Sequence, residues 1–112
     1  MNHIGIQLDG ILNLDKQSDS TSMEVVRVVK RLTSQRHVGH GGTLDPQATG
    51  VLPVCFGQAT RVMEYLIEGE KIYRARIKLG VSTDTYDAQG KVTRVDNPSG
   101  VNLADIERTL KP

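Results

Sequence analysis

The stretch Gly39-His40-Gly41-Gly42-Thr43-Leu44-Asp45-Pro46-Gln47-Ala48-Thr49-Gly50 holds four of the 11 glycines of this 112-residue chain. Its glycines are too frequent for a helix or a strand, and they let a backbone turn sharply or approach a ligand closely. Because a residue before proline is held in an extended conformation, Pro46 restricts the backbone of Asp45. We therefore expect residues 37–50 to form a shaped loop that presents one carboxylate. An aspartate in such a loop more often closes a turn than performs chemistry, so the loop alone leaves both roles open.

A helix is predicted upstream of the loop, at residues 22–34. Thr21 and Glu24 have the spacing of a capping box, in which each side chain bonds the other residue's backbone amide. Apolar residues at helical spacing predict one inward face, made by Val25, Val28, Val29 and Leu32. The other side is basic, and its charge fits either phosphate contacts or an ordinary solvated surface: Arg27, Lys30 and Arg31. Before this helix, residues 4–14 indicate a strand pair, or one strand with a turn at Asp9-Gly10.

Downstream of the loop, the pattern predicts a short buried strand at residues 51–56 and a helix at residues 58–67 that ends before Gly69. Residues 71–79 alternate between apolar and basic side chains, which predicts a half-buried strand. Its inward face is Tyr73, Ala75, Ile77 and Leu79, and its outward face is Arg74, Arg76 and Lys78. A polar loop at 80–87, a strand at 91–95 and a helix at 103–110, capped by Asn102, complete the chain.

Composition limits the classes of protein to consider. The chain is 38% hydrophobic and 24% charged with a net charge of +1, which is typical of a soluble globular domain and fits a polycationic tail poorly. Basic residues concentrate at 16–40 and 71–94, as expected for a directed contact with an anion or for solvated faces. The single cysteine, Cys55, excludes an intramolecular disulfide and a cysteine-cluster metal site. With no membrane-length apolar stretch and no signal peptide, we expect a cytoplasmic protein with no membrane partner.

Several spaced motifs together resemble the TruB family of pseudouridine synthases. The central motif is Gly39-His40, Gly42-Thr43-Leu44-Asp45-Pro46 and Ala48-Thr49-Gly50-Val51-Leu52-Pro53. Upstream stand Gly10-Ile11-Leu12-Asn13-Leu14-Asp15-Lys16 and Thr21-Ser22. Downstream stand Gly57-Gln58-Ala59-Thr60-Arg61, Lys71-Ile72-Tyr73, Leu79-Gly80 and Thr83-Asp84-Thr85-Tyr86-Asp87-Ala88-Gln89-Gly90. Motifs in the right order over nearly the whole chain are more specific than any one of them.

The resemblance implies a fold class and a reaction. The fold is α+β, with a mixed, mainly antiparallel sheet flanked by helices, and residues 1–112 are the N-terminal part of the catalytic domain. The C-terminal half and the RNA-binding extension of the family are absent, so the fold is incomplete. The implied reaction is isomerisation of uridine to pseudouridine in the T loop of tRNA, at position 55 of the tRNA, with the T-arm stem-loop as partner. It needs no metal and no redox cofactor.

The resemblance also assigns roles to residues. Asp45 matches the essential aspartate, which acts covalently on the ribose C1′ or the uracil C6 of the target uridine. Tyr73 matches the tyrosine that stacks on the target base, although the strand pattern by itself favours core packing. His40 matches the histidine that fills the space left by the extruded uridine. The remaining implied RNA contacts are the motif residues Lys16, Gly42 and Thr43, joined on charge alone by Arg27, Lys30, Arg31, Arg74 and Arg76.

The chain departs from the family pattern in two ways. After Lys16 the family usually continues with Pro-x-Gly, where this chain reads Gln17-Ser18-Asp19, and Gly41 stands where Thr or Ser is usual. The family's later motifs, including the arginine that pairs with the catalytic aspartate, are also missing from these residues. An alternative reading is therefore a truncated, catalytically weak RNA-binding remnant of such an enzyme.

Overall fold

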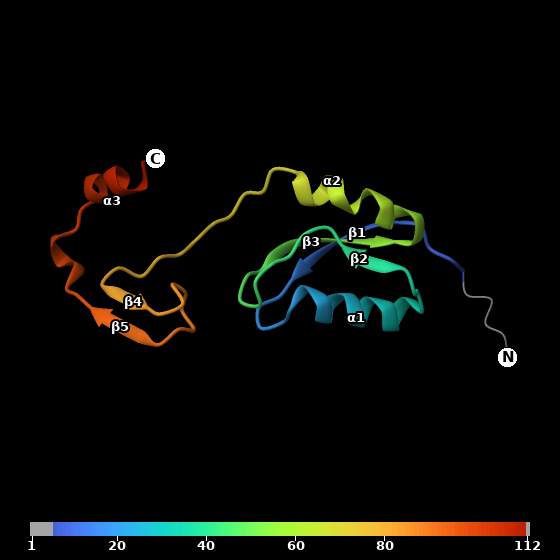
Figure 1. The fold of residues 1–112 in the computed structure, drawn as a ribbon, viewed down its shortest axis with the longest axis horizontal. Coiled ribbons are helices and arrows are strands. Elements are labelled where there is room, and N and C mark those ends of the chain that lie inside the picture. Colours follow the sequence, from blue (N-terminus) through green and yellow to red (C-terminus); the bar gives the residue numbers. More distant parts are fainter. Residues whose placement is uncertain (1–5, 112) are drawn as a thin grey trace. The chain divides into compact units, whose positions relative to one another are not determined.

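A computed structural model describes residues 6–111 and shows two compact units, Met1–Lys71 and Ile72–Pro112 (Figure 1). The first unit holds a three-stranded antiparallel sheet in the order β1-β3-β2, with β1 at Gly10–Lys16, β2 at Val38–His40 and β3 at Gly50–Phe56. The α+β class with antiparallel pairing is thus confirmed. The register pairs Gly10 with Phe56 and Lys16 with Gly50, so both ends of the Gly-rich loop start from the same sheet.

The predicted strand at 51–56 is confirmed, but the predictions on either side of it need correction. The strand expected at 4–14 runs instead from Gly10 to Lys16, residues 6–9 form no strand, and residues 4 and 5 lie outside the described residues. The loop expected at 37–50 contains β2, which pairs with the end of β3 through Val38 and Phe56. Three residues are too few to show an alternating pattern, so tertiary pairing decides this strand.

Helix α1, Ser22–Thr33, follows the sequence prediction closely at its start. Thr21 accepts a hydrogen bond from the Glu24 amide, and the Glu24 side chain accepts one from the Thr21 amide, so the capping box is confirmed. The predicted apolar face is wrong in part. Val26 and Val29 are buried, while Val28 and Leu32 are 42% and 76% exposed. Valines at four positions of one helix allow two overlapping apolar stripes, and packing of the helix start against the loop selects one of them.

The core lies between α1 and one face of the sheet. Val26 and Val29 of the helix meet the alternate residues of β3, Leu52, Val54 and Phe56. Because side chains along a strand alternate between faces, Cys55 points to the other face, where it is fully buried. This burial raises the pKa of the Cys55 thiol and keeps it neutral, so it behaves as a small hydrophobic side chain as expected.

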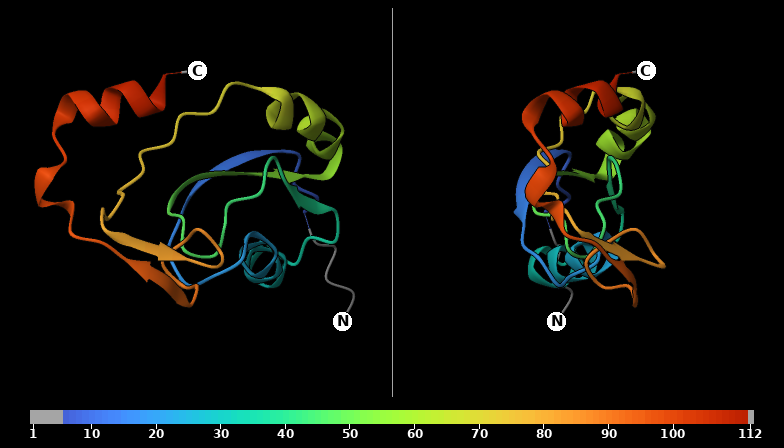
Figure 2. Two further views of the ribbon diagram at one scale, coloured as in Figure 1. Left: turned by 60° about the vertical axis from the view of Figure 1, so that its left-hand side comes forward. Right: turned by 90° about the vertical axis from the view of Figure 1, so that its left-hand side faces the viewer.

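The other face of the sheet is covered by a short helical segment, as both further views show (Figure 2). It consists of η1, Gly57–Val62, and α2, Met63–Glu68, with Gly69 directly after its end as predicted. Met63 lies over Gly39 of β2, and Leu66 lies over Gly41 at the start of the Gly-rich loop. Val62 and Ile67 of this segment are 41% and 49% exposed, because so short a helical segment brings only part of each turn onto the sheet.

The second unit contains the antiparallel hairpin of β4, Val81–Thr83, and β5, Val92–Val95, followed by η2, Pro98–Gly100, and α3, Leu103–Leu110. Asn102 caps α3 as predicted. The half-buried strand predicted at 71–79 is wrong: the segment is extended but joins no ladder, and Tyr73 and Ile77 are 66% and 71% exposed. Alternation favours an extended chain, but a strand also needs a neighbour for its amide and carbonyl groups. Within residues 6–111, no helix is long and apolar enough to cross a membrane.

Candidate active site

The loop that connects β2 and β3 places Asp45 at the start of a tight turn. The Ala48 amide donates to the Asp45 carbonyl at 2.9 Å, with Pro46 in the second position, where its fixed φ favours the turn. At the beginning of the loop, the Gly41 amide donates to the Pro53 carbonyl at 2.8 Å. The turn therefore uses the backbone of Asp45, and its side chain is left exposed. The sequence leaves open whether the Asp45 side chain closes a turn or performs chemistry, and here the backbone carbonyl, not the side chain, closes the turn.

A buried lysine fastens this turn to the sheet. The Lys16 side chain is 1% exposed, and its ammonium group donates to the carbonyls of Gln17, Pro46 and Ala48 at 2.9, 3.0 and 2.7 Å. The register places Lys16 opposite Gly50, the first residue of β3, which brings its side chain beneath the turn. From the sequence, Lys16 is expected to contact RNA, but its ammonium group is buried and donates to backbone carbonyls instead.

Ser22 fastens the loop a second time, on the other side of Asp45. Its hydroxyl accepts a hydrogen bond from the Leu44 amide at 3.0 Å and donates to the Leu44 carbonyl at 3.3 Å. Ser22 is the first residue of α1 and is 2% exposed. Sequence reasoning missed this role. The available signal was a polar residue on the inward side of the helix, at i−4 and i−7 from Val26 and Val29.

His40 closes the loop on itself. Its ring Nδ1 lies 2.6 Å from the Gly42 carbonyl, and since a carbonyl can only accept, this nitrogen donates the hydrogen bond. Gly42 has φ of +130°, a conformation that side chains rarely adopt. A Cβ on Gly41 would lie 2.9 Å from Cβ of Leu66, which gives a physical reason for glycine where a hydroxyl residue is usual. The imidazole is thus held at the loop entrance, half-buried.

The Asp45 carboxylate is presented to solvent from a backbone that is fastened on both sides. Within residues 6–111, no side chain donates a hydrogen bond to this carboxylate and no cation forms an ion pair with it. Such a group is free to add to an electrophilic carbon or to accept a proton. Among the same residues, no three His, Cys, Asp or Glu side chains converge as a metal site would require.

The structure brings some of the predicted site residues together and separates others by unit. The first unit contains His40, Gly42, Thr43, Asp45 and Lys16 around one loop, and it exposes Arg27, Lys30 and Arg31 along α1. Tyr73, Arg74 and Arg76 belong to the second unit and are exposed. The expectation that Tyr73 packs inward is therefore wrong, because its segment has no strand to pair with.

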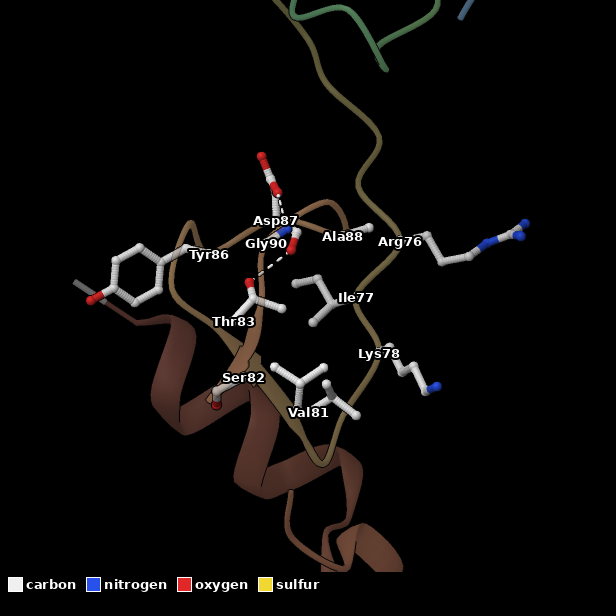
Figure 3. A pocket seen from close by; sticks show the side chains of 11 residues that line it. Arg76, Ile77, Lys78, Val81, Ser82, Thr83, Tyr86, Asp87, Ala88 and Gly90 are labelled. Atoms are coloured by element: carbon white, nitrogen blue, oxygen red, sulfur yellow. Dashed lines mark hydrogen bonds between the residues drawn. The ribbon is translucent and has the colours of Figure 1, made fainter. Parts of the chain in front are cut away.

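The second unit has an open hollow of about 590 Å³ beside the β4–β5 hairpin, lined at its centre by Ile77, Val81 and Thr83 (Figure 3). Arg76 and Lys78 point away from it on the outer side of the extended segment. The lining mixes apolar residues such as Ile77 and Val81 with polar ones, and the Thr83 hydroxyl in it is already bonded to the Asp87 carbonyl. The exposed cations beside it are the chemically distinctive part of this region.

Comparisons with known proteins bear directly on these residues. A family model described as TruB family pseudouridylate synthase (N terminal domain) matches residues 30–112. A tRNA pseudouridine synthase B from Clostridium perfringens is 46% identical over 99 residues, which cover 88% of this chain and 34% of that protein. The protein of the same name from Dehalococcoides mccartyi is 56% identical over 103 residues, covering 92% and 34%. The chain thus spans about a third of the length of these curated relatives. A solved structure of an H/ACA RNP bound to a substrate RNA containing 2′-deoxyuridine aligns with 50% of this chain at 50% identity and a TM-score of 0.49.

Proposed function

The chain belongs to the TruB family of pseudouridylate synthases, and we propose that it supplies the nucleophile loop for converting uridine to pseudouridine in the T loop of tRNA. The observation that carries the proposal is the exposed Asp45 carboxylate on a turn fastened by Lys16 and Ser22. A reaction on tRNA would take place in the cytoplasm. We propose residues 1–112 as the N-terminal part of the catalytic domain.

The proposed chemistry begins with attack by Asp45. The carboxylate adds to C1′ of the ribose or to C6 of the uracil, the glycosidic bond breaks, and the uracil turns so that C5 bonds to C1′. The proton on C5 then leaves to restore the ring. An ionised carboxylate suits this sequence because it adds to electrophilic carbon and later leaves as a stable anion. A fastened backbone holds the attacking oxygen in place and so reduces the entropy lost in reaching the transition state.

The target uridine has to leave its stack before Asp45 can reach it. His40 is proposed to fill the vacated space, and the proposal is supported by the contact with Gly42 that holds its ring at the entrance of the same loop. Tyr73, exposed in the second unit, is proposed to stack on the extruded base. The cations on α1 and on the extended segment, Arg27, Lys30, Arg31, Arg74 and Arg76, are proposed phosphate contacts.

A second candidate function is RNA binding without turnover. It is favoured by one observation: among residues 6–111, no cation lies in an ion pair with Asp45, whereas a nucleophilic carboxylate works best with a fixed positive partner. The two candidates share the RNA partner and differ only in the chemical step. The same experiment can therefore separate them.

The experiment uses a T-arm stem-loop with 5-fluorouridine at the target position. It is mixed with the 112-residue chain, with Asp45→Asn, and with Asp15→Asn as a control that removes an exposed carboxylate from β1. Denaturing gels detect a covalent protein–RNA adduct, and nucleoside analysis detects rearranged product. An adduct or product that needs Asp45 but not Asp15 supports catalysis. Equal binding by all three proteins with neither adduct nor product supports the RNA-binding candidate, and no binding contradicts both.

A further inference from the structure

Tyr86 is the most exposed aromatic side chain in the part of the chain that the structure describes, with 97% of its surface accessible. It stands in the connection between β4 and β5 and has φ of +60°, a conformation in which a bulky residue is a rare exception. Glycine, asparagine or aspartate would occupy this turn position with less strain. An exposed apolar ring in a disfavoured backbone conformation contributes little to the stability of the fold, so its presence calls for another reason.

The turn around Tyr86 is rigidly built, which separates it from an ordinary surface loop. One carboxylate oxygen of Asp87 accepts hydrogen bonds from the Thr85 hydroxyl at 2.7 Å, the Gln89 amide at 2.9 Å and the Gly90 amide at 3.2 Å. The Thr83 hydroxyl donates to the Asp87 carbonyl at 2.7 Å, and a carboxylate oxygen of Asp84 accepts from the Lys91 amide at 2.8 Å. These bonds fix the backbone on both sides of Tyr86, so its ring is presented with little freedom left to lose on binding.

The direction of the ring shows that it does not serve the hairpin's own packing. Tyr86 is among the residues at the edge of the hollow, but in Figure 3 its ring projects away from Ile77, Val81 and Thr83, in keeping with its 97% exposure. The charged side chains of residues 84–90, Asp84 and Asp87, are both acidic and would repel a phosphate group. A planar apolar ring beside carboxylates is instead suited to the face of a nucleobase, because stacking needs no positive charge.

We propose that Tyr86 is a stacking platform for an unpaired nucleobase of the RNA that this chain binds. The inference rests on the proposed function for its choice of RNA as the partner. It adds a contact in the second unit that no charge pattern predicts, and it selects for single-stranded bases over paired ones. The chain has three tyrosines, one phenylalanine and no tryptophan, so few of its side chains could stack on a base.

The test compares two RNAs: a stem-loop with 2-aminopurine in its unpaired loop, and the same stem as a blunt duplex. Each is titrated with the wild-type chain and with Tyr86→Asn, Tyr86→Phe and Tyr65→Ala. Asparagine tolerates positive φ, so Tyr86→Asn removes the ring while the hairpin keeps its turn, which the amide signals of Gly90 and Lys91 check. Tyr65 on α2 is 67% exposed and serves as the matched control.

We expect Tyr86→Asn to bind the stem-loop about 5- to 140-fold more weakly and to lose quenching of the 2-aminopurine fluorescence. Tyr86→Phe and Tyr65→Ala should bind like the wild type, and affinity for the duplex should not change. Wild-type affinity of Tyr86→Asn for the stem-loop overturns the inference, as does a wild-type chain that binds both RNAs equally. If the wild-type chain forms no Asp45-dependent adduct but its binding to the stem-loop still depends on Tyr86, only the catalytic proposal is contradicted.

Discussion

Replacing Lys16 by methionine should destabilise the first unit strongly, although it removes only one amino group. Methionine keeps most of the unbranched side chain and fills the same buried space, so no large cavity forms. The change removes the three hydrogen bonds from the ammonium group to Gln17, Pro46 and Ala48. The last two carbonyls belong to the turn that follows Asp45, so the loop loses its attachment to β1.

The magnitude follows from opposing terms. Hydrogen bonds made by a charged group contribute about 1.5–3 kcal/mol each, which gives roughly 4.5–9 kcal/mol for the three bonds. Methionine also removes the cost of burying an ammonium group, which is several kcal/mol in a protein interior. The net loss in the free energy of unfolding should be about 3 kcal/mol, a large part of the roughly 5–15 kcal/mol that holds a small domain together.

The assay is hydrogen exchange of backbone amides, because it reads each unit separately. Protection of Leu52 and Val54 in β3 should fall by the full amount in Lys16→Met, while protection of Val92 in β5 should not change. Lys30→Met, which removes an exposed ammonium group from α1, is the control and should stay within about 0.5 kcal/mol of the wild type. If Lys16→Met protects β3 as well as the control does, the loop carbonyls do not depend on Lys16 and the reasoning fails.

Four further predictions concern the same unit. Leu52→Ala should lower the free energy of unfolding by about 2–5 kcal/mol, because Leu52 is 1% exposed in the core; unchanged chemical denaturation would contradict the packing described. Thr21→Ala should cost about 1 kcal/mol through loss of the α1 cap, measured by exchange of the first helical amides. Hydrogen bonds from the Thr21 amide and, to a smaller extent, from its hydroxyl lower the pKa of Glu24. The contribution of this cap to stability is therefore present above the usual pKa of 4.5 and is lost as pH falls through the lower pKa of the folded state. Glu24→Gln should abolish this acid sensitivity. Gly41→Ser should displace α2, and Leu66→Ala in the same chain should restore the fold, whereas additive effects of the two changes would show that they do not touch.

Local interactions were predictable from the sequence. The cap formed by Thr21 and Glu24, the cap at Asn102 and the apolar pattern of β3 all depend on residues within a few positions of one another. Their signals are therefore complete in a short window. The resemblance to a family added the role proposed for Asp45, which spacing and composition could not provide.

Features that depend on distant pairing were not predictable. The burial of Lys16 follows from its register opposite Gly50, and a lysine in a sequence otherwise indicates a solvated position. The rotation of α1 follows from Ser22 bonding Leu44, residues 22 positions apart. The extended segment at 71–79 has the alternation of a strand, but pattern reports only which faces a strand would have and not whether a neighbour exists.

The attachment of the Asp45 turn to Lys16 has a consequence for how the protein is made. The bonds from Lys16 close loops of 30 and 32 residues, and every group in this frame precedes Lys71. Domains fold during synthesis from the N-terminal end, so a growing chain can assemble the Asp45 turn as soon as β3 has left the ribosome. The turn that presents Asp45 is then shaped before the residues of the second unit are translated.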